Sequence, residues 1–157
     1  MSFFFCTFAA AIFVRLHIRT CAHERENKIE QYYKNMAKQI DLTTHTDKRG
    51  NLTVIEKVIP FDIKRIFYIY GVDDSVRGGH RHHTTVQAAI CIQGACKIHC
   101  DNNREQNEYV LDKPYKCLIL EPEDWHTMYD FTPDAILMVL ASTEFDAKDY
   151  IFEPYKH

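Results

Sequence analysis

The sequence from residue 52 onward is a series of short apolar runs separated by turn residues, and this pattern constrains the fold most strongly. Val, Ile, Tyr and Phe dominate the runs, while Pro, Gly, Asn and Asp stand between them. No helical period longer than a turn or two separates the runs, so a parallel sheet with crossover helices is not indicated. The spacing predicts an all-β fold of antiparallel strands. We expect strands at 52–57, 64–70, 84–92, 95–101, 108–111, 116–120, 126–130 and 135–141.

Size and composition support one globular domain. The chain has 157 residues, of which 46% are hydrophobic, so it can bury a core and is not disordered as a whole. Its formal net charge is -3, which lacks the basic excess that a phosphate backbone would attract. Nucleic acid is therefore not an expected partner.

The cysteines indicate thiols rather than a disulfide framework. Cys91, Cys96, Cys100 and Cys117 lie within apolar runs, where a small thiol fits a buried strand, and none belongs to a Cys-x-x-Cys pair. Cys96 and Cys100 would share one face of a strand, but no second pair completes a tetrahedral metal site. This cysteine usage favours a cytoplasmic protein.

The first 35 residues differ from the rest of the chain. An apolar run at 3–14 is shorter than the roughly 20 residues that span a bilayer, and no Lys or Arg precedes it as in a signal peptide. We expect a helical or irregular N-terminal extension at 1–35 and one domain at 36–157, with no membrane partner. A tail or an upstream start before Met36 is favoured over a targeting segment.

The densest group of ionisable side chains is the segment RGGHRHH at 77–83. We expect a short loop that feeds the strand starting near residue 84. On an extended backbone alternate side chains share a face, so His80 and His82 would point together while Arg81 points away. Gly78 and its neighbour allow a ligand to approach the backbone closely. A solvated histidine-rich loop is the alternative.

This segment opens a longer pattern that resembles the first motif of the cupin jelly-roll barrel. His80 and His82 are followed by Gln87 and Gly94 at the cupin spacing, except that the usual Glu is Gln87. A weaker second motif ends in Trp125 and His126. In metal cupins His126 would be the third histidine ligand. Because a neutral amide is a poorer ligand than a carboxylate, the Gln87 replacement makes a metal site less favoured.

Residues from about 40 to 155 resemble the dTDP-sugar 3,4-ketoisomerases, which are cupin enzymes of deoxysugar biosynthesis. The matching segments are DKRGNL at 47–52, IPFDIKRIFYI at 59–69, RGGHRH at 77–82, GACK at 94–97, WH at 125–126, MYDF at 128–131, MVLAS at 138–142 and DYI at 149–151. The resemblance implies a cupin-type double-stranded β-helix and conversion of dTDP-4-keto-6-deoxyglucose into its 3-keto isomer. Gly79, where an aromatic is common, and His83, where Lys is common, depart from the family pattern.

The resemblance implies that His80 and His82 transfer protons through an enediolate. Imidazole suits both donation and acceptance, because its ordinary pKa lies near neutrality. We leave open which ring serves the carbon atoms and which serves the oxygens. Tyr68 is a candidate to hydrogen-bond the enediolate, or it is a half-buried barrel tyrosine.

The remaining candidates are assigned to substrate binding, with no cofactor and no metal. Arg65 and Arg77 can offer guanidinium groups to the pyrophosphate, or they form surface ion pairs. Gln87, Trp125 and His126 would line the sugar or base pocket, although a lone Trp is often a core residue.

The resemblance also implies a homodimer with an exchanged N-terminal strand. Arg49 would then reach the partner's site. Two alternative functions remain: a metal-dependent cupin using His80, His82 and His126, and a non-catalytic cupin that binds a sugar nucleotide.

Overall fold

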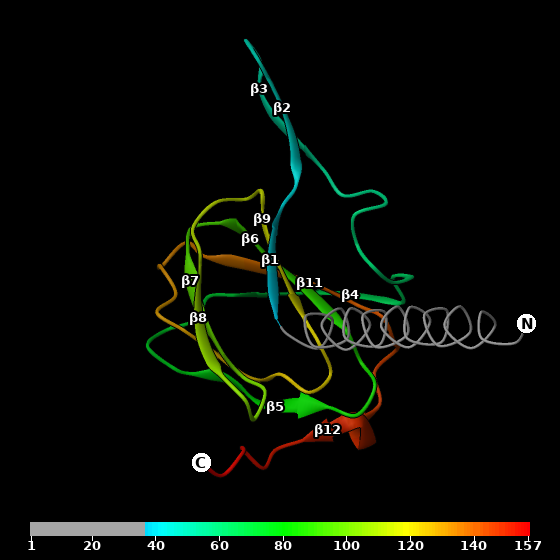
Figure 1. Ribbon diagram of the computed structural model, residues 1–157. Coiled ribbons are helices and arrows are strands. Elements are labelled where there is room, and N and C mark those ends of the chain that lie inside the picture. The colour runs from blue at the N-terminus through cyan, green and yellow to red at the C-terminus, as the bar shows by residue number, and fades with distance from the viewer. Residues whose placement is uncertain (1–36) are drawn as a thin grey trace, which may run out of the picture. The chain divides into compact units, whose positions relative to one another are not determined.

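Two five-stranded antiparallel sheets and a separate two-stranded hairpin make up the computed structural model (Figure 1). The structure describes residues 37–157, so the expectations for residues 1–35 lie outside it. The first sheet has the order β1 (Lys38–Asp41), β9 (Lys116–Leu120), β6 (Gln87–Gln93), β11 (Ile136–Ala141) and β4 (Arg65–Tyr70). The second sheet has the order β12 (Tyr150–Ile151), β5 (Arg77–His82), β10 (Trp125–Tyr129), β7 (Cys96–Asp101) and β8 (Gln106–Leu111). The expected all-β fold is confirmed.

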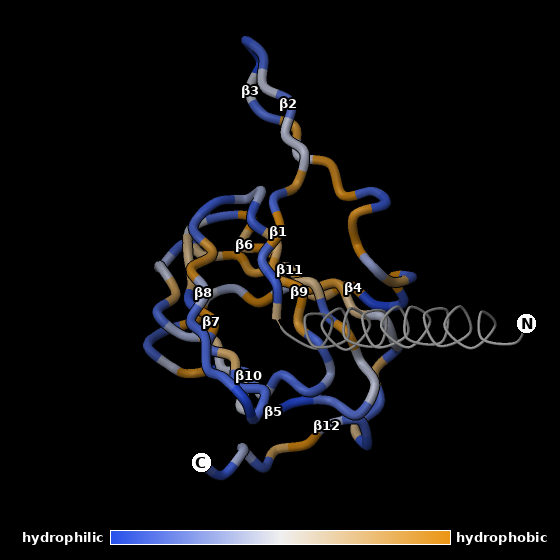
Figure 2. Tube along the Cα trace, in the orientation of Figure 1, coloured by the Kyte–Doolittle hydropathy of each residue, from blue (hydrophilic) through white to orange (hydrophobic). Residues whose placement is uncertain are grey.

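The main core lies between the two sheets. Ile98 and Met128 of the second sheet belong to the same buried cluster as Leu118, Leu137 and Val139 of the first. Alternate residues of a strand point to opposite faces, so each strand contributes every second side chain to this core. Figure 2 shows the first sheet as largely hydrophobic around β6 and β11, whereas β5 is hydrophilic.

A second buried cluster covers the other face of the first sheet. Ala88 and Ile90 of β6 pack there with Leu140, and the connection after β3 adds Ile55 and Phe61. The first five residues of β6 are therefore buried on both faces. This explains why β6 reads as a continuous apolar run rather than as an alternating one.

Some strand predictions were wrong. Residues 77–82 form β5 rather than a loop, and the next strand begins at Gln87 instead of near residue 84. The strand expected at 52–57 is β3 (Gly50–Val54), which pairs only with β2 (Thr43–Asp47). These strands and β1 are mostly polar and exposed, so they carry little hydrophobic pattern.

The β2–β3 hairpin projects away from the two sheets (Figure 1). Its two strands pair with each other over five residue pairs, from Thr43 with Val54 to Asp47 with Gly50. A two-stranded hairpin is marginally stable in water by itself. Leu52 at its surface is 64% exposed.

The C-terminal segment is fastened across the second sheet. A 3₁₀ turn, η1 (Ala147–Asp149), leads into β12, which pairs with β5 through Tyr150 and Ile151. The Tyr155 hydroxyl donates to the Glu123 carbonyl oxygen at 3.0 Å. The last residue, His157, lies with Nε2 2.6 Å from Asp101 Oδ2.

Two further features concern the helices and the cysteines of the described residues. Within residues 37–157, no helix is long and apolar enough to cross a membrane. The four cysteines of this part of the chain, Cys91, Cys96, Cys100 and Cys117, are buried free thiols, as the sequence predicts.

Candidate active site

Three histidine rings gather on the inner face of the second sheet. His80 and His82 are two residues apart on β5, and His126 is the direct partner of His80 on β10. The ring centroid of His80 lies 5.1 Å from that of His82 and 4.9 Å from that of His126. His82 and His126 are buried, whereas His80 is partly exposed. The expectation that His80 and His82 share a face agrees with this arrangement.

A β-bulge at Gly78 and Gly79 turns Arg77 toward the same face as the histidines. The pairing of β5 with β10 shifts between His126 and Thr127, so that Arg77 lies opposite Met128. Direct cross-strand partners project from the same face, and Met128 belongs to the inner core. In a regular strand Arg77 and His80 would point to opposite faces. The bulge therefore sets Arg77 opposite Met128, where its side chain is exposed.

Gly78 is needed for this bulge. Its φ of 82° lies in the left-handed region, and a Cβ there would lie 2.6 Å from the His126 carbonyl oxygen. Gly79 also has a positive φ of 73°, but a Cβ there would meet nothing within 4 Å. The close approach of the β5 and β10 backbones thus depends on Gly78.

Both ring nitrogens of His82 have partners. Nδ1 lies 2.9 Å from Asp149 Oδ2, and Nε2 lies 3.1 Å from the side-chain nitrogen of Gln87. Burial and the nearby His80 lower the pKa of His82 to about 4, although Asp149 acts in the opposite direction. His82 is therefore a neutral imidazole at neutral pH.

His126 and His80 are also neutral bases. The Nδ1–H of His126 donates to the Asp124 carbonyl oxygen at 2.9 Å, which leaves an acceptor lone pair on Nε2. This Nε2 atom is buried and has no hydrogen-bond partner. Burial lowers the pKa of His126 to about 3 and also lowers the pKa of His80. Such a group can accept a proton or a hydrogen bond from a bound hydroxyl.

Arg65 and Gln87 lie on the inner face of the first sheet. Arg65 stands beside Phe67, with its guanidinium carbon 5.3 Å from that ring centroid, and Phe67 packs on the inner core. Its charge contributes to the lowered pKa of His82, which places it near that ring. The Gln87 side-chain oxygen is buried without a hydrogen-bond partner. A bound ligand with hydroxyl groups would satisfy it.

Other predicted residues are not brought to the histidines within this chain. Tyr68 is 63% exposed on the outer face of β4, opposite in direction to Arg65 and Phe67. Trp125 alternates with His126 along β10 and so points to the other face of that strand. The sequence left two interpretations of Tyr68 open: a half-buried barrel tyrosine and a hydrogen-bond partner of the enediolate. Within this chain, an outward and mostly exposed ring fits neither of them.

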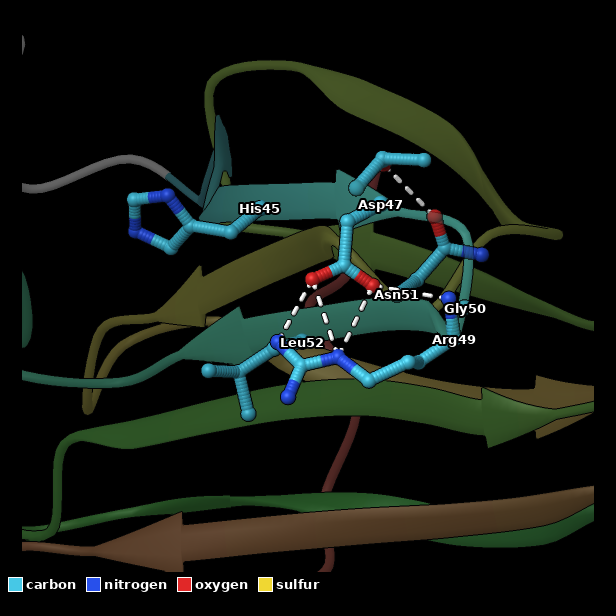
Figure 3. Close-up of a pocket in the computed structure, with 7 residues that line it drawn as sticks. His45, Asp47, Arg49, Gly50, Asn51 and Leu52 are labelled. Carbon is cyan, nitrogen blue, oxygen red and sulfur yellow. Dashed lines mark hydrogen bonds and ion pairs between the residues drawn. The ribbon is translucent and has the colours of Figure 1, made fainter.

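Arg49 lies at the tip of the projecting hairpin. Its guanidinium folds back on Asp47, with Nη2 2.6 Å from Oδ2 (Figure 3). A hollow of about 410 Å³ at this hairpin is lined by His45, Thr46, Asp47, Arg49, Gly50, Asn51 and Leu52. This hollow lies on the hairpin and not among the histidines, so we regard the histidine cluster as the candidate active site.

Sequence reasoning missed two members of the cluster. Asp149 bonds His82, and the Tyr150 ring centroid lies 4.8 Å from that of His80 and 4.7 Å from that of His82. Both residues were noted only as part of the family resemblance. The sequence separation of 67 between His82 and Asp149 exceeds any local spacing that could signal such a contact.

The geometry of the cluster also bears on metal binding. Within residues 37–157, no group of three or more His, Cys, Asp and Glu side chains is arranged to hold a metal ion. A histidine binds a metal ion through a free lone pair on a ring nitrogen. At His82 the Nε2 atom faces the Gln87 amide nitrogen instead.

The chain matches known proteins in sequence. The family model described as "FdtA: WxcM-like, C-terminal" matches residues 35–157. A curated relative from Aneurinibacillus thermoaerophilus, TDP-4-oxo-6-deoxy-alpha-D-glucose-3,4-oxoisomerase, is 40% identical over 117 residues, which cover 73% of this chain and 84% of the relative.

Solved structures agree. The 3,4-ketoisomerase QdtA from Thermoanaerobacterium thermosaccharolyticum, as a variant in complex with TDP-4-keto-6-deoxyglucose, is 41% identical with a TM-score of 0.72, covering 74% of this chain and 87% of its own. WlaRA, a TDP-fucose-3,4-ketoisomerase from Campylobacter jejuni, is 36% identical with a TM-score of 0.70, covering 74% of this chain and 89% of its own. The rmlC epimerase of Mycobacterium tuberculosis shares the fold at 16% identity, with a TM-score of 0.64. The predicted cupin-type fold is confirmed.

Proposed function

The chain belongs to the FdtA-type family of sugar-nucleotide 3,4-ketoisomerases, as its motifs indicated, and we propose that it moves the keto group of TDP-4-keto-6-deoxyglucose from C4 to C3. The observation that carries this proposal is the pair of neutral imidazoles, His80 and His82, on one strand face with ring centroids 5.1 Å apart. The reaction removes the C3 proton, passes through an enediolate and returns a proton to C4, while a hydroxyl proton changes oxygen. One ring serves the carbon atoms and the other serves the oxygens.

The binding residues divide by charge. Arg77, which is exposed opposite Met128, and Arg65 would hold the pyrophosphate through charge-assisted hydrogen bonds. The unpaired acceptors on Gln87 and His126 would receive hydrogen bonds from the sugar hydroxyls. In this proposal the nucleotide lies at the cations and the sugar lies against the histidines.

An NMR assay tests the activity directly. Purified protein is incubated with TDP-4-keto-6-deoxyglucose in deuterated water, and the sugar signals are followed with time. The expected product is the 3-keto isomer, with deuterium at C4 unless the C3 proton is carried across without exchange. A substrate that binds but stays unchanged would favour the non-catalytic, sugar-binding alternative.

We also propose a homodimer in which the β2–β3 hairpin packs on the partner and carries Arg49 toward the partner's site. The hairpin projects from the two sheets, and among residues 37–157 its strands pair with each other alone (Figure 1). The outer face of β4 offers an apolar surface, because Ile66, Tyr68 and Tyr70 are 57%, 63% and 69% exposed. Light scattering should give the mass of a dimer, and Tyr68→Arg should give a monomer. A wild-type monomer at micromolar concentration would contradict this proposal.

Mixed dimers test the role of Arg49 across the interface. If Arg49 acts on the partner's site, mixing inactive His80→Asn protein with impaired Arg49→Ala protein restores one complete site in each hybrid. The matched control mixes His80→Asn with Arg77→Ala, because Arg77 lies on the same strand as His80 and no complete site can form. Equal recovery in both mixtures, or none in either, would contradict action across the dimer.

We place the enzyme in the cytoplasm. The free thiols of the described residues suit a reducing compartment, and the proposed substrate is a sugar nucleotide. Fractionation of cells that express the chain, followed by the same NMR assay, checks this.

A further inference from the structure

Asp149 is the most heavily hydrogen-bonded side chain near the histidines. Its Oδ1 atom accepts from the Thr84 backbone N–H and from the Thr84 hydroxyl, each at 2.9 Å. Its Oδ2 atom lies 2.9 Å from His82 Nδ1 and also accepts from the Thr85 hydroxyl. Burial works to raise the pKa of Asp149, but hydrogen bonds from Thr85 and Thr84 and the nearby His82 outweigh it and lower the pKa to about 2. Asp149 is therefore an anion that only accepts.

An anion at this place fixes the tautomer of His82. Because the carboxylate has no proton to donate, Nδ1 of His82 must carry the hydrogen and Nε2 must be the acceptor. The position of Gln87 agrees, since its side-chain nitrogen faces Nε2 at 3.1 Å and an amide N–H donates. Thr143 supports the other end, because its hydroxyl lies 2.6 Å from that of Thr85. Every hydrogen bond in this chain of groups has one consistent direction.

The position of Asp149 is also determined by the backbone. Its carbonyl oxygen accepts from the His83 N–H at 2.9 Å, and the following residue, Tyr150, pairs with His82 in the β12–β5 ladder. The carboxylate therefore approaches His82 from a segment that is itself hydrogen-bonded to the strand carrying that histidine. Such double attachment holds a side chain within the narrow geometry that proton transfer needs.

We infer that Asp149 is a positioning residue, which holds His82 as the Nδ1–H tautomer so that its Nε2 lone pair stays available to the reacting sugar. The inference rests on the proposed isomerase function and deepens it. A substrate hydroxyl would compete with the Gln87 amide for that lone pair. The titratable and charged groups facing His82 from the surrounding elements are His80, His126, Arg65, Asp149 and Tyr150.

The alternative is that Asp149 only fastens the loop between β5 and β6. Asp149→Asn separates the two roles, because the Thr84 backbone N–H must still find an oxygen. The Asn oxygen would take the Oδ1 position and its NH₂ group the Oδ2 position. That NH₂ group would donate to Nδ1 of His82 and force the hydrogen onto Nε2. The hydrogen bonds that hold the loop would largely remain, while the tautomer of His82 would change.

Two measurements test the inference. In ¹⁵N-labelled wild-type protein at neutral pH, long-range ¹H–¹⁵N spectra should show His82 protonated at Nδ1, whether or not the enzyme turns over. In Asp149→Asn, the hydrogen should move to Nε2 and kcat should fall about 10²–10⁴-fold, with KM changed little. The control is Asp146→Asn, which changes another aspartate of the same turn whose side chain accepts from the Lys148 N–H. It should keep both the tautomer and the rate.

The outcomes are distinct. A wild-type His82 protonated at Nε2 would overturn the inference, even if Asp149→Asn fails to fold. Equal rates for Asp149→Asn and Asp146→Asn would overturn it as well. A wild-type protein that shows the Nδ1–H tautomer but does not convert TDP-4-keto-6-deoxyglucose would instead contradict the proposed function.

Discussion

His80 and His126 are direct cross-strand partners, and their rings meet at an interplanar angle of 66° with centroids 4.9 Å apart. A positive charge on either ring therefore disfavours a charge on the other, in addition to the penalty from burial. Burial lowers the pKa of both rings, and the charge of His80 adds to the lowering at His126. Both imidazoles therefore favour the neutral form, which can accept a proton.

Replacing either proposed proton-transfer residue should abolish most of the turnover. His80→Asn and His82→Asn remove the basic nitrogen while keeping a polar side chain of moderate size, so kcat should fall about 10²–10⁴-fold. Binding of the substrate, measured by calorimetry, should persist because the arginines remain. His83→Asn is the matched control, since His83 is exposed. Near-normal rates in both variants would show that the pair is structural.

The bulge predicts a specific glycine requirement. Gly78→Ala should lose much more stability to denaturant than Gly71→Ala. Both glycines have positive φ, so each alanine would cost about 1–2 kcal/mol in backbone strain, but only at Gly78 would the Cβ meet a carbonyl oxygen at 2.6 Å. The active-site face should be disturbed as well, so Gly78→Ala should lose turnover. Equal losses of stability in the two variants would contradict the close approach.

Turnover should not depend on a metal ion. Proton transfer needs free imidazole lone pairs, and Gln87 gives the cupin position no anionic ligand. Dialysis against a chelator should leave the rate of the NMR assay unchanged, and metal analysis should find no stoichiometric ion. Loss of activity on chelation that is restored by Zn, Fe or Mn would support the metal-dependent alternative.

Asp124 should make the stability fall as pH rises. Burial raises the pKa of Asp124 from 3.8 to about 7 in the folded protein. Between these values the folded state binds more protons than the unfolded state, so this contribution is present below pH 4 and is lost as pH rises through about 7. His82 and His126 act in the opposite sense, because their lowered pKa values favour the unfolded state in acid.

The measurement is therefore a difference between two proteins. The melting temperature of Asp124→Asn minus that of the wild type should increase from pH 5 to pH 8, because the amide does not titrate. Asp47→Asn is the matched control: hydrogen bonds from Arg49 lower the pKa of Asp47, so this variant's difference from the wild type should not increase over that range. A difference that stays constant with pH would contradict the raised pKa.

Residues 1–35 should be dispensable for folding and turnover. The family model starts at residue 35, and a chain that begins at Met36 keeps Ala37, whose carbonyl oxygen accepts from the Tyr109 hydroxyl at 2.7 Å. Thermal melting and the NMR assay on this truncated protein check the prediction. Aggregation or loss of activity would show that the extension has a structural role.

The sequence could predict the strands that are built from apolar side chains of the core. Residues 116–120 were expected as a strand and form β9, because an apolar run between turn residues has few other interpretations. It could not predict β5 as a strand, because Gly78 and Gly79 with positive φ interrupt a polar segment. There the pairing with β10, a long-range contact, determines the structure.

For the site, alternation was a better guide than residue type. It placed His80 and His82 together, and it also implies that Arg65 and Tyr68, three positions apart on β4, point to opposite faces. Both were nevertheless chosen as site residues from their chemistry. Gln87 was expected to line the substrate pocket in place of the usual cupin Glu, whereas its contact with His82 Nε2 depends on the three-dimensional position of both side chains.

The hydrogen bond between His82 and Asp149 spans 67 positions of the chain, and this separation has a consequence during protein synthesis. At about 5–20 residues per second, a ribosome takes roughly 3–13 s to add the residues that lie between them. Asp149 and Tyr150 therefore become available only after all the strands from β4 to β11 have been synthesised. The contact proposed to position His82 is thus one of the last of this barrel that the growing chain can make.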